Sequence, residues 1–233
     1  MTDDARRDEL AANLADVRSR IAAAARGAGR DPAELTLVAI TKTWPAADVR
    51  RLVELGVRDV GENRDQEAAG KARELLDLPI RWHFVGQLQT NKVRSVVEYA
   101  HVVESVDRPR LVAALDRACG AAGRTLSCLV QVALDDVPGR GGVVPADLAQ
   151  LADDVAGRAN LALGGLMAVA PLGTDPDVAF GRLADLHREL LVDHPLATTL
   201  SAGMSGDLEA AVRHGATHVR IGTAVLGHRP GIG

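Results

Sequence analysis

Lys42 is the side chain of this sequence with the clearest potential for covalent chemistry. It follows the apolar run 37–40 and Thr41, and it precedes Thr43-Trp44-Pro45, where Pro45 can open a helix. A lysine at the end of a buried strand is partly desolvated, and desolvation favours the neutral amine. The neutral amine can form an imine with an aldehyde. The alternative is a lysine that lies along apolar surface and pairs with a carboxylate such as Glu62.

Two glycine-bearing loops near the C-terminal end carry residue types that hold a phosphate group. One follows the apolar run 198–201 and the other follows the run 218–221. Their glycines and hydroxyl residues are Gly203, Ser205, Gly206, Gly222 and Thr223. Glycine lets the backbone approach an anion, hydroxyls donate hydrogen bonds, and amides at the start of the next helix add partial positive charge. Each loop alone is also typical of a turn with a helix cap, but their shared position favours a phosphate site.

Arg220 lies two residues before Gly222, so it can reach the far side of a ligand whose phosphate lies at Gly222 and Thr223. An arginine stays protonated. Opposite a pyridine nitrogen it must donate a hydrogen bond and keep that nitrogen unprotonated, which weakens the ring as an electron sink. The alternative role for Arg220 is a structural salt bridge.

Polar residues also follow the second apolar run, 58–61. We expect Asn63 to point toward the same end of the fold as Lys42. Glu62, Gln66 and Glu67 can equally complement a helix dipole, and for Glu67 we favour that structural role.

The third run, 82–86, contains His83 and is followed by an unusually polar helix start. Asn91 and Lys92 in that segment are either ligand contacts or part of a capping network. His83 lies inside the run, so we expect a hydrogen-bonded core histidine.

The elements that must position these residues alternate regularly along the chain. Along residues 8–25, ahead of the first strand, one helical stripe is formed by Leu10, Leu14, Val17 and Ile21, and Gly27 and Gly29 then offer stops. The eight short apolar runs are 35–40, 58–61, 82–86, 101–106, 126–134, 162–170, 198–201 and 218–221. Helical spacing separates them, and eight such units predict a (β/α)8 barrel rather than an open doubly wound sheet.

Composition predicts one soluble domain that binds a small molecule. The 233 residues suffice for a single barrel over 1–233, with the leading helix in 1–30 and the barrel in 35–227. Aromatic residues make up 2%, so Val, Leu, Ile and Ala must fill the barrel. A net charge of −4 provides no strong field for nucleic acid or an anionic membrane.

The expected compartment is the cytoplasm. Residues 1–9 lack the apolar segment of a secretory signal, and no apolar run reaches the roughly 20 residues that a membrane span needs. Cys119 and Cys128 are too few for a disulfide framework and have no metal-ligand spacing. We therefore expect a reducing setting and no metal.

Six segments together resemble the pyridoxal phosphate homeostasis protein family, whose fold is that of the N-terminal barrel of alanine racemase. They are Thr41-Lys42-Thr43, Gly61-Glu62-Asn63 with Gln66-Glu67, the stretch 82–92, Gly165-Leu166-Met167, the stretch 200–207, and the stretch 219–224. The resemblance covers about Leu35 to Gly227 and is highly specific.

The resemblance implies that the aldehyde is pyridoxal 5'-phosphate and that Lys42 forms a Schiff base with it. It further implies that Arg220 faces the pyridine nitrogen. In the same resemblance the phosphate is held by Ser205, Gly222 and Thr223, and the ring is lined by Asn63 and Met204. One departure lies in the glycine-rich loop 135–142, which we expect to be mobile. Family members often have a lysine where this chain has Arg140, and an arginine cannot form an imine.

The function that follows is intracellular buffering of pyridoxal 5'-phosphate, with delivery to apo-enzymes, by a monomer that is not an enzyme. An alternative is an amino-acid racemase, which needs a second base opposite Lys42. The only tyrosine, Tyr99, lies in a helical segment before the fourth run, so we expect weak racemase activity at most. A third reading is a barrel that binds another phosphorylated metabolite, with Lys42 as a plain phosphate contact.

Overall fold

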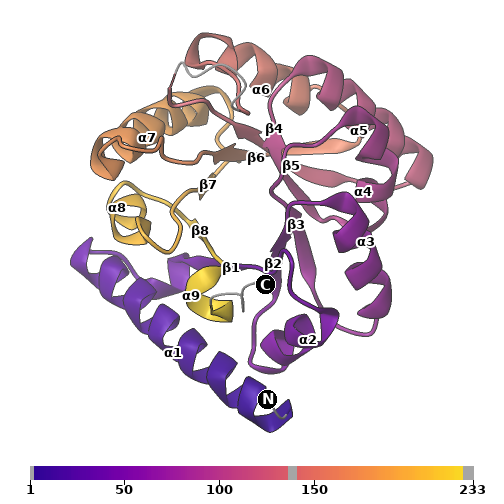
Figure 1. The fold of residues 1–233 in the computed structure, drawn as a ribbon. Coiled ribbons are helices and arrows are strands. Elements are labelled where there is room, and N and C mark those ends of the chain that lie inside the picture. Colours follow the sequence, from indigo (N-terminus) through magenta and orange to yellow (C-terminus); the bar gives the residue numbers. More distant parts are fainter. Residues whose placement is uncertain (1–2, 136–140, 228–233) are drawn as a thin grey trace.

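The computed structural model describes residues 3–135 and 141–227, which form a closed barrel of eight parallel strands (Figure 1). The strands follow one another around the barrel in sequence order, and β1 also pairs with β8. Their bounds are β1 Thr36–Ile40, β2 Asp59–Glu62, β3 Arg81–Phe84, β4 Val102–Val106, β5 Leu126–Gln131, β6 Leu161–Met167, β7 Thr199–Ser201 and β8 His218–Ile221. The predicted fold class is confirmed.

Helices surround the barrel on its outside (Figure 1). Their bounds are α1 Asp3–Gly27, α2 Ala46–Glu54, α3 Asp65–Glu74, α4 Val93–Tyr99, α5 Pro109–Ala122, α6 Leu148–Ala156, α7 Pro176–Asp193, α8 Leu208–Arg213 and α9 Thr223–Leu226. Short 3-10 turns are η1 Pro32–Glu34, η2 Thr90–Lys92 and η3 Pro145–Asp147. None of the helices in the described ranges is long and apolar enough to cross a bilayer.

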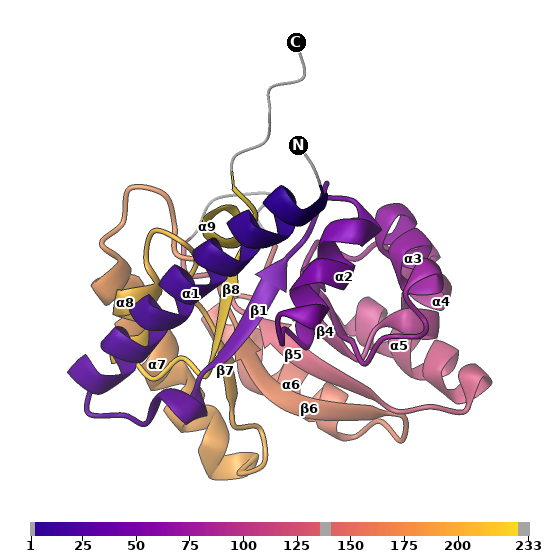
Figure 2. The ribbon, with the colours of Figure 1, turned by 90° about the horizontal axis from the view of Figure 1, so that it is seen from below.

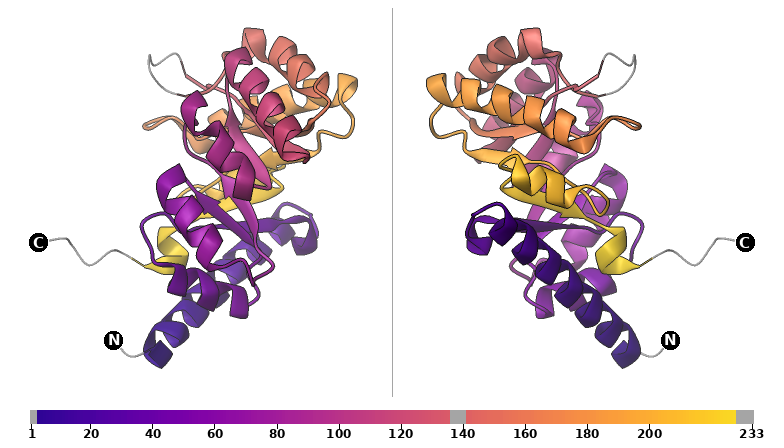
Figure 3. Two further views of the ribbon diagram at one scale, coloured as in Figure 1. Left: turned by 90° about the vertical axis from the view of Figure 1, so that its right-hand side faces the viewer. Right: turned by 90° about the vertical axis from the view of Figure 1, so that its left-hand side faces the viewer.

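The leading helix α1 is longer than the periodic stripe predicted, because its polar first turns extend it to Asp3. The predicted stripe is buried, and the helix ends at Gly27 as expected. It crosses the outside of the barrel beside α8 and α9 (Figure 2). In Figure 3 the golden α8 lies between orange α7 and indigo α1, and both neighbours contact it. The helix therefore closes the side of the barrel where the last strands meet the first.

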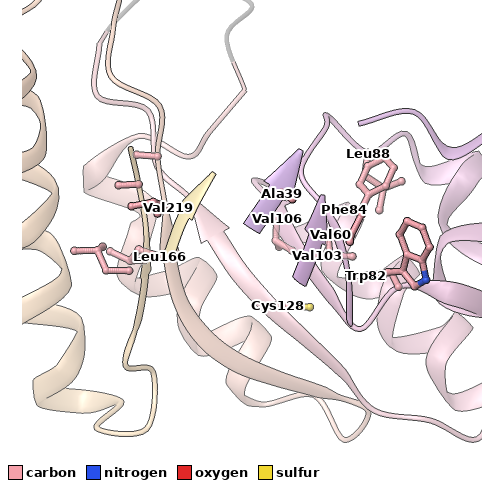
Figure 4. Packing of buried hydrophobic residues seen from close by; sticks show 14 of the residues in the cluster. Ala39, Val60, Trp82, Phe84, Leu88, Val103, Val106, Cys128, Leu166 and Val219 are labelled. Atoms are coloured by element: carbon pink, nitrogen blue, oxygen red, sulfur yellow. The ribbon is translucent and has the colours of Figure 1, made fainter. Parts of the chain in front are cut away.

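Most of the apolar core lies between the strands and the surrounding helices. Trp82, Phe84 and Leu88 gather on the helix-facing side of the strands, and Leu166 and Val219 do the same on the other side of the barrel (Figure 4). These residues belong to one continuous buried cluster. The branched and aromatic side chains thus hold the helices onto the barrel.

The barrel interior differs from the expectation that aliphatic side chains fill it. A separate small cluster of Val102, Leu129 and Met167 is apolar. Beside it lie buried polar and charged side chains, among them His83 and Arg220. Alternation along each strand sends these residues inward while their apolar neighbours face the helices. The interior is polar because residues such as His83 and Arg220 occupy the inward-pointing positions of strands whose outward-pointing residues are apolar.

Candidate functional site

Lys42 lies in a tight turn directly after β1. The turn is closed by the amide of Trp44, which donates to the carbonyl oxygen of Thr41 at 3.0 Å. Thr43 has a φ of 71°, a left-handed conformation that is rare for a β-branched residue. The Lys42 side chain is exposed, which corrects the expectation of partial desolvation. The reason is that the turn carries Lys42 beyond the last strand residue, where neighbouring strands no longer cover it.

A buried lysine, Lys71 of α3, anchors this turn from below. Its ammonium donates to the carbonyl oxygen of Thr41 at 2.8 Å and to Glu62 Oε1 at 2.6 Å. The hydroxyl of Thr41 donates to the same Glu62 oxygen at 2.6 Å. Burial raises the pKa of Glu62, and this effect exceeds the lowering by the hydrogen bonds from Lys71 and Thr41. Glu62 is therefore the partner of Lys71, and the alternative that Lys42 pairs with Glu62 is wrong.

Glu67 lies in the first turn of α3, where a carboxylate complements the helix dipole as expected, and it also makes contacts that the sequence did not predict. Its Oε1 accepts from Lys71 at 2.7 Å and also from the amide of Thr43. Thr43 is thus linked through Glu67 to the Lys71 ammonium. The same ammonium binds the carbonyl oxygen of Thr41. Together Lys71, Glu62 and Glu67 form what we call the turn clamp.

Asn63 follows β2 at the same end of the barrel as Lys42. Its Oδ1 is buried and has no hydrogen-bond partner within the described ranges. The backbone of Asn63 packs against Gly86, where an added Cβ would lie 2.2 Å from the Asn63 carbonyl oxygen. The end of β2 is therefore held close to the end of β3, and an acceptor without a partner remains there.

A cavity of about 500 Å³ opens beside Asn63. Its lining includes Asn63, Arg64, Gln66, Gln87, Gln89 and Lys92. Neither Gln89 nor Lys92 caps its helix with a side-chain hydrogen bond, so the capping alternative for this segment is not supported. Lys92 faces the cavity, whereas the exposed Asn91 is not part of its lining.

The two glycine-bearing loops follow β7 and β8, as the sequence predicted. Gly203 has a φ of 91°, and an added Cβ would lie 2.7 Å from the Cβ of Ala211. In the same loop the amide of Met204 donates to Asp207 Oδ1 at 2.6 Å. An added Cβ at Gly222 would lie 3.3 Å from the carbonyl oxygen of Ile40. The backbone of the second loop thus packs closely against the end of β1.

Four of the predicted positions follow strands that are consecutive neighbours around the barrel. Asn63 follows β2, Lys42 follows β1, Gly222 follows β8, and Met204 follows β7. Pairing joins β2 to β1, β1 to β8, and β8 to β7. Since all eight strands are parallel, these residues lie at one end of the barrel. Ser205 lies in the same loop as Met204, and Thr223 is the first residue of α9, directly after Gly222. Arg140 lies outside the described residues.

Arg220 lies inside the barrel below this end and is 4% exposed. Its NH1 donates to Ser201 Oγ at 2.8 Å, and its NH2 donates to the carbonyl oxygen of Ala168 at 2.8 Å. Glu104 Oε2 lies 3.8 Å from NH1. The guanidinium therefore contacts Glu104 of β4, Ser201 of β7 and Ala168, which follows β6, so the structural salt bridge that the sequence left open is present.

His83 is a hydrogen-bonded core histidine, as predicted. Its Nδ1 lies 2.7 Å from Glu104 Oε1, and its Nε2 lies 2.9 Å from Asp59 Oδ1. Burial lowers the pKa of His83, but the two carboxylates outweigh burial and raise it above 6.5. Burial and the neighbouring His83 lower the pKa of His218 to about 4. His83 is therefore the more basic imidazole of this pair.

Glu104 is anionic although it is fully buried. Burial opposes its ionisation, but the hydrogen bond and charge of His83, and the charge of Arg220, hold its pKa at about 2. Glu104 and Asp59 are not among the residues that the sequence singled out, and Ser201 belonged there only to the run 198–201 and the stretch 200–207. A signal existed, because a carboxylate inside the apolar run 101–106 is costly unless it has a buried partner.

Comparison with known proteins places the chain in a family. The profile described as "Alanine racemase, N-terminal domain" matches residues 7–230. A "Pyridoxal phosphate homeostasis protein" of Mycobacterium leprae (strain TN) is 48% identical, over 95% of this chain and 93% of that protein. The chain belongs to the pyridoxal phosphate homeostasis protein family. Its Escherichia coli (strain K12) member is 38% identical over 95% of this chain and 97% of that protein.

Solved structures agree with this assignment. PipY of Synechococcus elongatus PCC7942, solved with PLP bound, is 37% identical with a TM-score of 0.82, over 94% of this chain and all of PipY (100%). An alanine racemase from Streptomyces lavendulae has a TM-score of 0.72 at 22% identity, over 97% of this chain and 58% of the racemase. The likeness to the racemase shows the shared barrel fold alone. The family resemblance drawn from the sequence is confirmed.

Proposed function

We propose that this chain binds pyridoxal 5'-phosphate through an imine bond to Lys42 and serves to buffer the cofactor and deliver it to apo-enzymes. One observation carries the proposal. The turn with Lys42 lies between the end of β2, which carries Asn63, and the end of β8, which carries Gly222. An amine, an acceptor without a partner and a close-approach glycine loop therefore meet at one end of the barrel. The family membership and the ligand of PipY support the same conclusion.

The residues at this end fit the cofactor. The buried Oδ1 of Asn63 lacks a hydrogen-bond partner within the described ranges and can accept one from a ligand. Gly203 and Gly222 bring the backbone of the two loops into close contact with Ala211 and Ile40, and a side chain at either glycine would crowd these residues. Ser205 is half-buried and Thr223 is exposed, and both hydroxyls can donate to a phosphate oxygen.

Each residue has a distinct task in the proposal. The lone pair of Lys42 Nζ attacks the aldehyde carbon, a C=N bond forms, and the aldehyde oxygen leaves as water with the two amine protons. Ser205, Gly222 and Thr223 hold the phosphate, and Asn63 and Met204 line the ring. Arg220 donates to the pyridine nitrogen. When bound, the cofactor supplies a reactive aldehyde, which attachment to Lys42 keeps from other amines.

A racemase is the less favoured alternative, and the position of Tyr99 is the reason. Tyr99 lies in α4 with its ring 6.5 Å from that of Trp82, on the helix-facing side of the barrel. Burial raises the pKa of Tyr99, so its phenol is a poor base. A second base opposite Lys42 is needed for proton exchange on both faces of a substrate, and Tyr99 does not reach that position.

We further propose that the protein works as a monomer in the cytoplasm. Cys119 and Cys128 are both buried and free, which suits a reducing compartment. The partners in this proposal are the cofactor and apo-enzymes that receive it.

The deciding experiment is borohydride reduction of the loaded protein followed by peptide mass spectrometry. Besides Lys42 the chain has only Lys71 and Lys92, so the attachment site can be assigned without ambiguity. Lys42→Ala should abolish the adduct, and Lys92→Ala is the matched control because Lys92 is also exposed. A colourless protein that takes up no cofactor, or an adduct on Lys92, would contradict the proposal. Incubation of the loaded protein with single amino-acid enantiomers tests the racemase alternative, which appreciable racemisation would support.

A further inference from the structure

A chain of five side chains crosses the barrel interior from Arg220 to Asp59. Arg220 NH1 donates to Ser201 Oγ at 2.8 Å, and Ser201 Oγ donates to Glu104 Oε2 at 2.6 Å. Glu104 Oε1 then lies 2.7 Å from His83 Nδ1, and His83 Nε2 lies 2.9 Å from Asp59 Oδ1. The links come from β8, β7, β4, β3 and β2 in turn.

Basic and acidic groups alternate along this interior chain. Arg220 and His83 are the basic groups, Glu104 and Asp59 are the carboxylates, and Ser201 lies between Arg220 and Glu104. An isolated buried charge is costly, whereas alternating charges that are hydrogen-bonded offset that cost. Arg220 can therefore stay buried and charged because Glu104 lies next to it.

The hydroxyl of Ser201 fixes the direction of the chain. It accepts from Arg220 and donates to Glu104, so its proton cannot rotate away without losing one of the two bonds. The two terminal nitrogens of Arg220 are committed to Ser201 and the Ala168 carbonyl oxygen. These two bonds use two of the five N–H donors of the guanidinium, and others remain to bind a ligand.

We propose that Ser201 and Glu104 are positioning residues for the ligand's ring nitrogen, which act by fixing the Arg220 guanidinium below the barrel end that carries Lys42. This inference rests on the proposed function. The benefit is preorganisation: a donor that is already held in place loses less freedom when the ligand binds. No contact between the ligand and Ser201 or Glu104 is required.

The test compares two ligands on two serine variants. The ligands are pyridoxal 5'-phosphate and an analogue in which carbon replaces the ring nitrogen. Ser201→Ala removes the link between Arg220 and Glu104. Ser105→Ala is the matched control, because Ser105 is also buried in the barrel wall and its hydroxyl has no partner among the described residues.

We expect Ser201→Ala to weaken binding of pyridoxal 5'-phosphate about tenfold, the effect of losing one charge-assisted hydrogen bond. Binding of the carbon analogue should change by less than about twofold, because no ring nitrogen is present to report on Arg220. Ser105→Ala should leave both dissociation constants unchanged. Equilibrium titration of the unmodified apo-protein and of both variants with each ligand, followed by absorbance, measures the six dissociation constants.

Equal weakening for the two ligands would overturn the inference, because it would indicate general damage to the site. So would Ser201→Ala binding like Ser105→Ala. If the unmodified protein binds neither ligand, the proposed function fails instead, so the two failures are distinguishable. Glu104→Gln provides a second variant, which should also weaken binding of pyridoxal 5'-phosphate more than binding of the carbon analogue. If Glu104→Gln fails to fold, Ser201→Thr replaces it as the second variant. It restores the hydroxyl and should recover the affinity for pyridoxal 5'-phosphate that Ser201→Ala loses.

Discussion

The ammonium of Lys71 lies 2.8 Å from the carbonyl oxygen of Thr41, so a buried lysine is bonded directly to the residue before Lys42. The turn that carries Lys42 is thereby fixed to α3 as well as to β1. Without this tie a left-handed threonine would be hard to sustain, since such conformations persist only when surrounding structure holds them. The position of the exposed Lys42 amine therefore depends on the turn clamp, whose groups lie beneath it.

Replacing Lys71 should show how much the turn clamp contributes. Lys71→Met removes the counter-charge of Glu62, whose side chain is 0% exposed, and should lower the free energy of unfolding by about 3 kcal/mol. Urea titration at neutral pH measures the change. Lys92→Met is the control, since Lys92 is exposed, and it should change stability by less than about 0.5 kcal/mol. Equal stability of the two variants would contradict a structural role for the clamp.

The raised pKa of His83 should make stability depend on pH. Its pKa is raised in the folded state by Asp59 and Glu104, so its contribution is fully present below 6.5. That contribution should disappear as the pH rises through the raised value. The difference in unfolding free energy between the native protein and His83→Gln, measured in urea from pH 6 to pH 10, should therefore shrink with pH. A difference that stays constant would show that His83 is neutral in the fold.

Acid should weaken the same interior chain by protonating Glu104. The pKa of Glu104 is lowered to about 2, so its contribution is present above its ordinary value of 4.5 and is lost as the pH falls toward 2. Glu104→Gln should remove the part of the acid destabilisation that falls in this range. Circular dichroism at a series of pH values follows the transition. If Glu104→Gln unfolds along the same acid curve as the native protein, the carboxylate does not titrate there.

Gly165 should not tolerate a side chain. Its φ is 143°, and an added Cβ would lie 1.9 Å from the carbonyl oxygen of Thr199 on the paired strand. Gly165→Ala should therefore destabilise the barrel by about 3 kcal/mol or more. Gly70→Ala is the opposite control, since it lies within α3 with open space around it and should stabilise by up to about 1 kcal/mol. Thermal unfolding of both variants checks the two signs.

The two cysteines should be unreactive in the folded protein. Cys119 and Cys128 are 0% exposed, and burial raises the pKa of both thiols, which disfavours the reactive thiolate. Iodoacetamide at neutral pH should label neither residue in native conditions and both in denaturant. Mass spectrometry counts the adducts. Rapid labelling of the native protein would mean that the region around β5 opens easily.

The order of elements could be predicted from the sequence because each run carried its own local signal. The final strand, His218–Ile221, begins and ends where the apolar run does. The fifth strand ends at Gln131, short of the expected Leu134, since apolar residues continue into the loop after it. Strand ends depend on where neighbouring strands stop pairing, and that is a long-range property.

The sequence by itself determined the barrel, the family, and the set of residues that follow its strands, because alternation and motif spacing are local. Tertiary structure alone decided which charges meet. Glu62 pairs with Lys71 rather than Lys42, and Glu104 on β4 lies beside Arg220 on β8. Glu104 and Arg220 lie far apart in the chain, and which side chains point inward is set only when the sheet closes. The exposure of Lys42 and the charged interior beneath it both follow from that closure.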